Sequence, residues 1–379
     1  ATVIPPLIDE LAELGAVGAV GPVISPSVGD AIDMAMAREI PLISPSSTAG
    51  SLAIAPDGGF IFRNAPNDNI QALVLASYLI GSFEGVGGEP VQSVHVLAQN
   101  DNYGTDLAGA FVSAFTDSGG TVADRFDFTA GTGGLTTASP DCEVTDPPTG
   151  DQTVAECLLQ RLDEAGARDV VLVSINDAIN LIATWNSLDP RPDFRWYFTD
   201  GARTSDFFDA APDSILDMVG SAPTAPELGD ALEQFEEAFE ERFPGEDIVE
   251  TAFTAQVWDG VHLLAAGLAR QSADGTEFGG IELARAIRDV SSGPGVILHA
   301  GRWRDLLAAV NANATVDFDG AAGPSDFDNC GETVGPYEIW RVVDQSGAKT
   351  SVRDQFFEAR EVAVQFQVTL EGLNNCPEF

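Results

Sequence analysis

The feature that most constrains the fold is an alternation of short strand-like apolar runs with helix-like amphipathic segments along most of the chain. Residues 4–14 have the i, i+3, i+4, i+7 spacing of a helix buried on one face, and the apolar run 16–20 ends in a Gly-Pro turn. Single helices between strands make parallel βαβ units, so we expect an α/β protein with helices on both sheet faces. Further strands are expected at 41–44, 60–63, 93–98, 122–126, 170–173 and 196–198, and further helices at 28–38, 70–80, 106–116, 154–165 and 178–187.

Beyond residue 222 the pattern shifts toward helix. Helices are expected at 228–243, 252–270 and 281–288, and strands at 337–343 and 362–369. The glutamates of the first helix lie opposite its apolar stripe, which indicates a hydrated face rather than an acid–base site. A chain of 379 residues exceeds one comfortable core, so we expect two domains.

The charge balance is extreme, with 18 basic and 59 acidic residues and a formal net charge of -41. Such a surface repels phosphate backbones and anionic headgroups, which excludes nucleic acid and anionic lipid as natural partners. We interpret the acids as a hydrated coat suited to salty surroundings. No apolar run of 18 residues is present, and the first residues do not resemble a secretion signal, so we expect any signal to have been removed or left out.

The four cysteines are Cys142, Cys157, Cys330 and Cys376, with no C-x-x-C pair and with three well separated histidines. A zinc site is therefore not expected. Of the three possible pairings, we expect the local one, Cys142–Cys157 and Cys330–Cys376, with buried free thiols as the alternative. Disulfides would place the protein in an oxidising compartment, periplasmic or extracellular.

Catalytic signatures are missing from the sequence. It has no G-x-x-x-x-G-K-[ST] loop and no G-x-S-x-G elbow. We therefore expect no enzyme and no cofactor. The notable polar features are instead the hydroxyl-rich loops 21–27 and 41–48, which follow expected strands. Ligands bind outside the carboxyl ends of parallel strands, where helix N-termini favour a carboxylate, although ordinary helix capping explains such serines equally well.

Several segments, in order, resemble the signatures of type I periplasmic binding proteins, closest to the leucine/isoleucine/valine-binding kind that serves ABC transporters. The resemblance covers about residues 4–345 and rests on 21–27, 40–48, 60–66, 100–104, 258–261, 317–328 and 337–340. The 100–104 segment departs from the family's D-x-x-Y-G loop, because asparagine replaces the first acid. The resemblance implies two doubly wound parallel-sheet lobes joined by a multi-strand hinge.

The resemblance also implies roles for residues of the first lobe. Ser25 and Thr48 fall where the family places hydroxyls on a ligand carboxylate, and the backbone around Ser46 falls beside them. Lobe one is expected to comprise 1–66 plus 223–320, and to lack the first βαβ portion of the family fold. That portion, or an N-terminal lipid anchor, would belong to a longer chain.

In the second lobe, 67–222 plus 321–379 with the C-terminal tail, the resemblance implies three ligand contacts. Tyr103 falls where an aromatic side chain covers the ligand, and Asn176 falls in a loop that lines the cleft. Asp200 falls where an acid pairs with a ligand ammonium group, with an N-cap on the next helix as the alternative interpretation. A zwitterion would then favour the closed form, because each lobe binds one of its charges.

The expected function is capture of a small polar solute, most simply an amino acid, for the membrane subunits of an ABC transporter. We expect a monomer in the periplasm or outside the cell. The alternative is the extracellular ligand-binding domain of a sensor or receptor, which would require a membrane helix and an output domain elsewhere in the gene. An enzyme using the Asp, Tyr and Ser side chains of the cleft fits least well.

Overall fold

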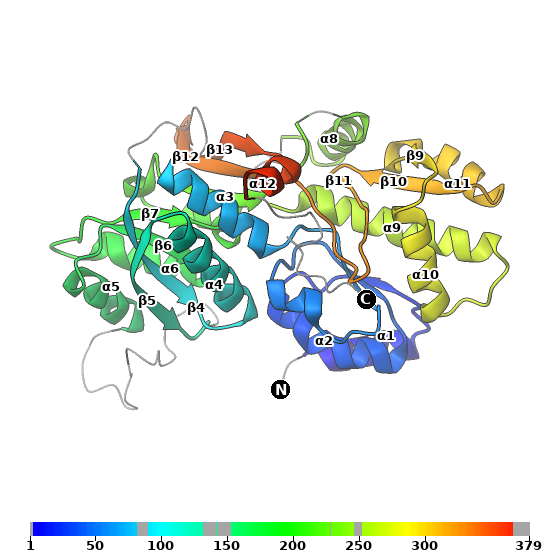
Figure 1. The fold of residues 1–379 in the computed structure, drawn as a ribbon, viewed down its shortest axis with the longest axis horizontal. Helices are drawn as coiled ribbons and strands as arrows, with labels where there is room; N and C mark the ends of the chain where they lie inside the picture. Colours follow the sequence, from blue (N-terminus) through cyan, green and yellow to red (C-terminus); the bar gives the residue numbers. More distant parts are fainter. Residues whose placement is uncertain are drawn as a thin grey trace.

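In the computed structural model the chain forms two α/β lobes that lie side by side (Figure 1). The α/β class predicted from the alternating pattern is confirmed. The structure describes residues 3–81, 90–131, 142, 153–227, 229–245 and 252–366.

The larger lobe is built on a seven-stranded sheet with the order β13-β12-β8-β7-β6-β4-β5. Strands β8 to β5 of this order run parallel, and β12 pairs antiparallel with both β8 and β13. Its strands are β4 (Ser93–Gln99), β5 (Thr121–Phe128), β6 (Asp169–Val173), β7 (Arg195–Phe198), β8 (Val219–Pro223), β12 (Tyr337–Gln345) and β13 (Ala348–Phe357). Its helices are α3 (Asp68–Ile80), α4 (Asn102–Asp117), α5 (Val154–Glu164), α6 (Asp177–Ser187), α7 (Ser205–Ala210) and α12 (Ala359–Phe366).

Each face of this sheet has its own core. On β4, Val94 and Val96 pack with α3 and α4, whereas Leu97 packs on the other side with α5 and α6. Successive side chains of a strand point to opposite faces, so a parallel strand covered on both sides must be apolar throughout. This explains why the central strand β6 has a continuous apolar run at 170–173.

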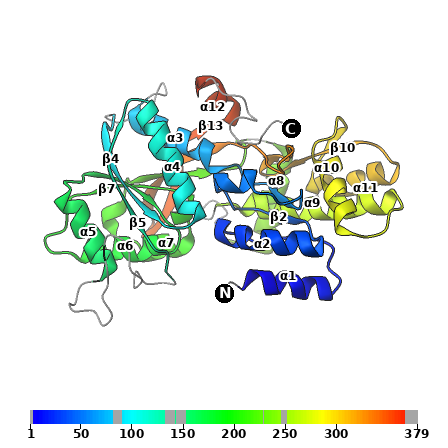
Figure 2. The ribbon, with the colours of Figure 1, turned by 60° about the horizontal axis from the view of Figure 1, so that its bottom comes forward.

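The smaller lobe contains two three-stranded sheets, with the orders β1-β2-β3 and β11-β10-β9. A shared core that includes Ile43, Phe62, Leu263 and Phe318 joins them across α9 and α10. Figure 2 shows α1 packed on the outer side of α2. The strands are β1 (Ala19–Val20), β2 (Leu42–Ser44), β3 (Ile61–Arg63), β9 (Val296–Leu298), β10 (Val316–Gly320) and β11 (Gly323–Pro324). The helices are α1 (Ile4–Glu13), α2 (Ser25–Arg38), α8 (Asp230–Arg242), α9 (Thr254–Ala273), α10 (Gly280–Ser291) and α11 (Trp303–Asn311).

The chain passes between the lobes after β3, after β8 and after β11. Two of these crossings are tied together by a fully buried ion pair between Arg63 and Glu332. The Arg63 Nη1 also donates to the carbonyl oxygens of Ser47 and Ala49, at 3.1 and 2.7 Å. The lobes are thus joined by a multi-strand hinge; the residue limits expected for each lobe remain a proposal.

One strand prediction is wrong. Residues 359–366 form helix α12, whereas a strand was expected at 362–369, and residues 367–369 lie outside the described residues. Consecutive Val362 and Ala363 are both buried against α3, which a half-covered strand could not achieve because its side chains alternate. Strand β13, which precedes α12, and helix α11 were not predicted from the sequence.

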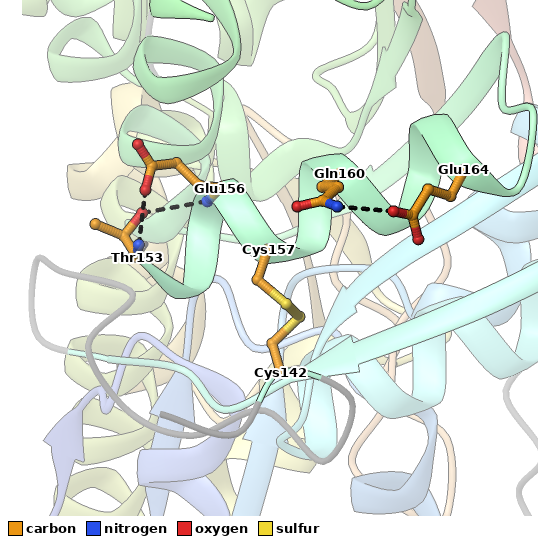
Figure 3. The surroundings of a disulfide bond; sticks show 6 residues. All are labelled: Cys142, Thr153, Glu156, Cys157, Gln160 and Glu164. Carbon is orange, nitrogen blue, oxygen red and sulfur yellow. Dashed lines mark hydrogen bonds between the residues drawn. A yellow bond between two sulfur atoms is a disulfide. The ribbon is translucent and has the colours of Figure 1, made fainter. Parts of the chain in front are cut away.

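The first predicted disulfide is confirmed. Cys142 and Cys157 are bonded, with their Cα atoms 5.9 Å apart (Figure 3). Cys157 lies in the first turn of α5, which begins with a reciprocal capping box between Thr153 and Glu156. Cys330 is also disulfide-bonded; the predicted Cys330–Cys376 pair involves Cys376, which lies outside the described residues.

Candidate functional site

Ser25 connects the two hydroxyl-rich loops of the smaller lobe. It is the first residue of α2, and the N-cap position is occupied by Ile24, so the capping interpretation is wrong at this residue. Its Oγ instead accepts the backbone N–H groups of Thr48 and Ala49, each at 3.2 Å. Both bonds use the oxygen as acceptor, so the hydroxyl proton stays available to an outside acceptor.

Ser46 and Thr48 occupy different positions in the second loop. The Ser46 hydroxyl donates to the Val23 carbonyl at 2.5 Å, which holds the two loops side by side. Thr48 is fully buried and does not line the interlobe cavity, and within the part of the chain that the structure describes its hydroxyl oxygen has no hydrogen-bond partner. The two loops are therefore joined to each other by the hydrogen bonds of Ser25 and Ser46.

In the larger lobe, Tyr103 lies in the first turn of α4. Asp101 caps this helix by accepting the Gly104 N–H at 3.0 Å. A Cβ on Gly104 would lie 2.0 Å from the Gln99 carbonyl oxygen, so glycine allows α4 to begin directly against the end of β4. The buried Tyr103 hydroxyl donates to Asp200 Oδ1 at 2.9 Å and accepts the Gly201 N–H at 3.2 Å.

Asp200 follows β7 directly and is 5% exposed. Its Oδ1 also accepts a hydrogen bond from Gln71 Nε2, at 2.8 Å. Burial raises the pKa of Asp200, and the bonds from Gln71 and Tyr103 offset part of the rise. The N-cap interpretation is wrong here, because the hydroxyl of Thr204 caps the next helix, α7, by accepting the Phe207 N–H.

Asp68 is a second buried carboxylate beside this network. It begins α3 just after the first crossing, and its N–H donates to the Thr48 carbonyl at 2.8 Å. Burial and the nearby charge of Asp200 raise its pKa well above the usual value. The nearest buried cation, Arg63, is paired with Glu332. The negative charges of Asp68 and Asp200 are thus buried close together behind the interlobe surface, and little positive charge offsets them.

A cavity of about 140 Å³ lies between the lobes where these elements meet. The first lobe contributes Ser25 and Ser46, and the second contributes Tyr103 and Asp200. The structure therefore brings together four of the six residues singled out from the sequence. Thr48 lies behind the wall, and Asn176 is exposed at the start of α6, where its neighbour Ile175 lines the cavity instead.

Two lining residues carried no signal in the sequence. Arg203 is buried and pairs with Glu338 of β12. Phe253 precedes α9 with φ 71°, a left-handed conformation that bulky residues rarely adopt. Only the folded structure shows that this strained turn directs an aromatic ring between the lobes, because neither periodicity nor a motif marks the position.

Two other site types were searched for. Within the described ranges, no group of His, Cys, Asp and Glu side chains is arranged to hold a metal ion. Among the same residues, no helix combines the length and apolar character needed to cross a bilayer.

Solved structures similar to this chain are binding proteins with low sequence identity. A leucine-binding protein, LivK, from Thermotoga maritima aligns with a TM-score of 0.69 and 15% identity, over 94% of this chain and 85% of that one. LivJ from Streptococcus pneumoniae, in complex with isoleucine, gives 0.63 and 17%, over 92% and 83%. A solute binding protein from Rhodopseudomonas palustris, in complex with 3,4-dihydroxybenzoic acid, gives 0.64 and 16%, over 94% and 83%.

The family assignment follows from the sequence itself. A search of curated proteins found no match. The sequence profile of the periplasmic binding protein family, however, matches residues 7–347, most of the chain. This match shows that the chain belongs to the periplasmic binding protein family, and its two-lobed fold is similar to that of the leucine-binding protein LivK.

Proposed function

We propose that this protein captures a small zwitterionic solute, most simply an α-amino acid, and delivers it to the membrane subunits of an ABC transporter. The observation that carries the proposal is Asp200, a buried carboxylate on the cavity that faces a cluster of hydroxyls on the other lobe. A ligand with one charge of each sign would complement both walls.

The cationic half of the ligand would bind at Asp200. Its hydrogen-bond partners, Gln71 and Tyr103, are neutral donors, and Arg203, which lines the same cavity, is paired with Glu338, so the buried Asp200 carboxylate lacks a cation of its own, which is unfavourable. A ligand ammonium group in the cavity would supply that cation. It would also relieve the repulsion between Asp200 and Asp68 that helps to raise the pKa of Asp68.

The anionic half would bind at the smaller lobe. The Ser25 hydroxyl retains a proton to donate, and α2 begins at this residue, so the positive end of its dipole faces the cavity. Because the two halves of the site lie on different lobes, a zwitterion favours the closed arrangement.

An aromatic acid is the second candidate solute. The R. palustris relative was solved with 3,4-dihydroxybenzoic acid, and here Tyr103, Phe253 and Arg203 line the cavity. A benzoate, however, carries no cation for Asp200 and would bring a second negative charge into the same small cavity. The buried carboxylate therefore favours an amino acid.

The proposed setting is the periplasm or cell exterior, with the protein as a monomer. The Cys142–Cys157 disulfide supports an oxidising compartment. A sensor or receptor ligand-binding domain would have the same cavity, so the neighbouring coding sequence distinguishes the two: a membrane helix and output domain would mark a receptor.

The test is calorimetric titration with leucine, 4-methylpentanoate, which lacks the ammonium group, and 3,4-dihydroxybenzoate. We expect leucine to bind, and Asp200→Asn to weaken it by about tenfold or more, since a charge-assisted hydrogen bond contributes roughly 1.5–3 kcal/mol. Asp209→Asn, an exposed change at the end of α7, is the matched control. Unchanged leucine affinity in Asp200→Asn, or tighter binding of 4-methylpentanoate than of leucine, would refute the proposal.

A further inference from the structure

A second and larger interlobe cavity adjoins the first. It measures about 300 Å³, and Arg203, Ala252 and Phe253 line both cavities. Small-molecule pockets in proteins usually measure about 300–1,000 Å³. The Asp200 cavity, at 140 Å³, is below that range, whereas the two together reach it.

The larger cavity has an apolar wall and a charged wall. Leu232 and Phe235 of α8 form the apolar side, together with prolines of the crossing that follows β8. The opposite side is formed by Glu338 of β12 and Arg353 of β13. A ligand that entered from the Asp200 cavity would therefore pass Phe253, run along aliphatic and aromatic surface, and end at charged groups.

At the charged end of the cavity, Arg353 is the residue that could bind a further group. Its Nε forms an ion pair with the buried carboxylate of Glu338, and its Nη2 donates to Thr224 Oγ1 at 2.8 Å. Its Nη1 lies 4.0 Å from the nearest oxygen of Glu227, beyond hydrogen-bond length. One edge of the guanidinium therefore keeps a donor for another acceptor.

Two of the molecule's few arginines, Arg203 and Arg353, meet at this wall. The buried carboxylate of Glu338 is contacted by two guanidinium groups, those of Arg203 and Arg353, in a chain with 59 acidic and only 18 basic residues. The remaining carboxylates of the cavity belong to Glu227 and Glu236, both exposed to solvent. A planar guanidinium binds a carboxylate better than it binds other acceptors.

We propose that the larger cavity is a second subsite, which takes the tail of an elongated amino-acid-like ligand and binds a carboxylate at the end of that tail through Arg353. The inference rests on the proposed function, because the zwitterionic head must first occupy the Asp200 cavity. It narrows the substrate class to dicarboxylic amino acids and their longer derivatives.

The test is a titration series in tail length and tail charge. The probes are glutamate, 2-aminoadipate and 2-aminopimelate, each compared with norleucine. We expect at least one of the longer acids to bind about tenfold or more tightly than norleucine, which corresponds to one charge-assisted hydrogen bond. Arg353→Gln should remove that preference and leave norleucine unchanged. Arg341→Gln, on β12 and paired with Asp354 away from the cavity, is the matched control.

A second variant tests whether the ligand occupies the volume of the larger cavity, independently of the charge of Arg353. Leu232→Trp fills the apolar side of the larger cavity without touching the smaller one. It should weaken the preferred long acid by about tenfold and leave alanine binding unchanged. This variant keeps the proposal testable even if Arg353→Gln does not fold.

The outcomes separate the two proposals. If alanine and norleucine bind but no acid binds better than norleucine, or if Arg353→Gln weakens all ligands equally, the second subsite is refuted and the proposed function stands. If the unmodified protein binds no amino acid, the proposed function fails, and the subsite fails with it.

Discussion

The buried carboxylates of this protein differ in their partners, and the partner decides what the group can do. Glu332 is paired with Arg63, whereas Asp259 has only backbone donors, the N–H groups of Ala321 and Ala322 at 2.8 and 2.7 Å. Asp259 thereby fixes the turn between β10 and β11 to helix α9. Because its partners are neutral, burial raises the pKa of Asp259 to about 7.

The raised pKa of Asp259 predicts a pH-dependent stability. The unfolded-state pKa is near 3.9, so between about pH 4 and pH 7 the folded protein binds more protons at this residue than the unfolded chain. The Asp259 contribution to the free energy of unfolding should therefore fall as pH rises through that window, by on the order of 4 kcal/mol, and be flat above it. Urea unfolding of the wild type and Asp259→Asn at pH 4.5, 6 and 8 measures this. Parallel pH curves for the two proteins would contradict it.

Sequence reasoning located the site residues that terminate strands. Ser25, Ser46, Tyr103 and Asp200 all follow parallel strands, and the carboxyl ends of such strands meet at one edge of a sheet. Phe253 could not be predicted as a site residue, because the position of its side chain depends on a left-handed backbone conformation that no neighbouring residue indicates.

At the scale of elements, α4 belongs to one lobe and contacts the other. Asp106 Oδ2 accepts the Ser51 N–H at 2.8 Å, and Asn102 Nδ2 donates to the Ser25 carbonyl at 3.0 Å. Both bonds join the two lobes directly, so both must break if the lobes separate. They therefore bias the protein toward closure without touching a ligand.

Asp106→Ala should weaken ligand binding indirectly. Loss of one hydrogen bond of about 0.5–1.5 kcal/mol from the closed form should lower affinity by about two- to tenfold, mainly through faster dissociation. Stopped-flow fluorescence with leucine measures the rate. Asp117→Ala, at the exposed far end of α4, is the control. A dissociation rate that does not change in Asp106→Ala would show that closure does not depend on this contact.

Two features of the elements could not be predicted from the sequence: where some helices begin, and whether residues 362–369 form a strand. Helix α4 starts at Asn102, four residues before the expected 106, because the Asp101 cap and the Gly104 close approach are tertiary features. The 362–369 strand prediction failed because a short apolar run fits either period until a partner such as α3 is known.

For the whole molecule, the net charge of -41 predicts a strong dependence of stability on salt. Added salt shortens the screening length from about 30 Å at 0.01 M to about 3 Å at 1 M, which reduces repulsion among the surface carboxylates of the compact state. We expect the melting temperature to rise by roughly 5 °C or more between 10 mM and 1 M KCl. Calorimetry measures it, with 1 M sucrose as a non-ionic control. A flat melting temperature in KCl would show that the acidic coat does not limit stability.

The hydrogen bonds and the ion pair of Arg63 affect the order in which the two lobes release a bound solute. Because Arg63 fixes the 47–49 backbone to the Glu332 crossing, the loops around Ser25 keep their shape when the lobes separate. The Asp200 side is tied to the smaller lobe by the α4 hydrogen bonds to Ser25 and Ser51, which must break when the lobes separate, so it withdraws with its own lobe. We expect the solute to remain on the smaller lobe through its carboxylate after its ammonium group has been released, so that unloading proceeds in two stages from a half-open intermediate.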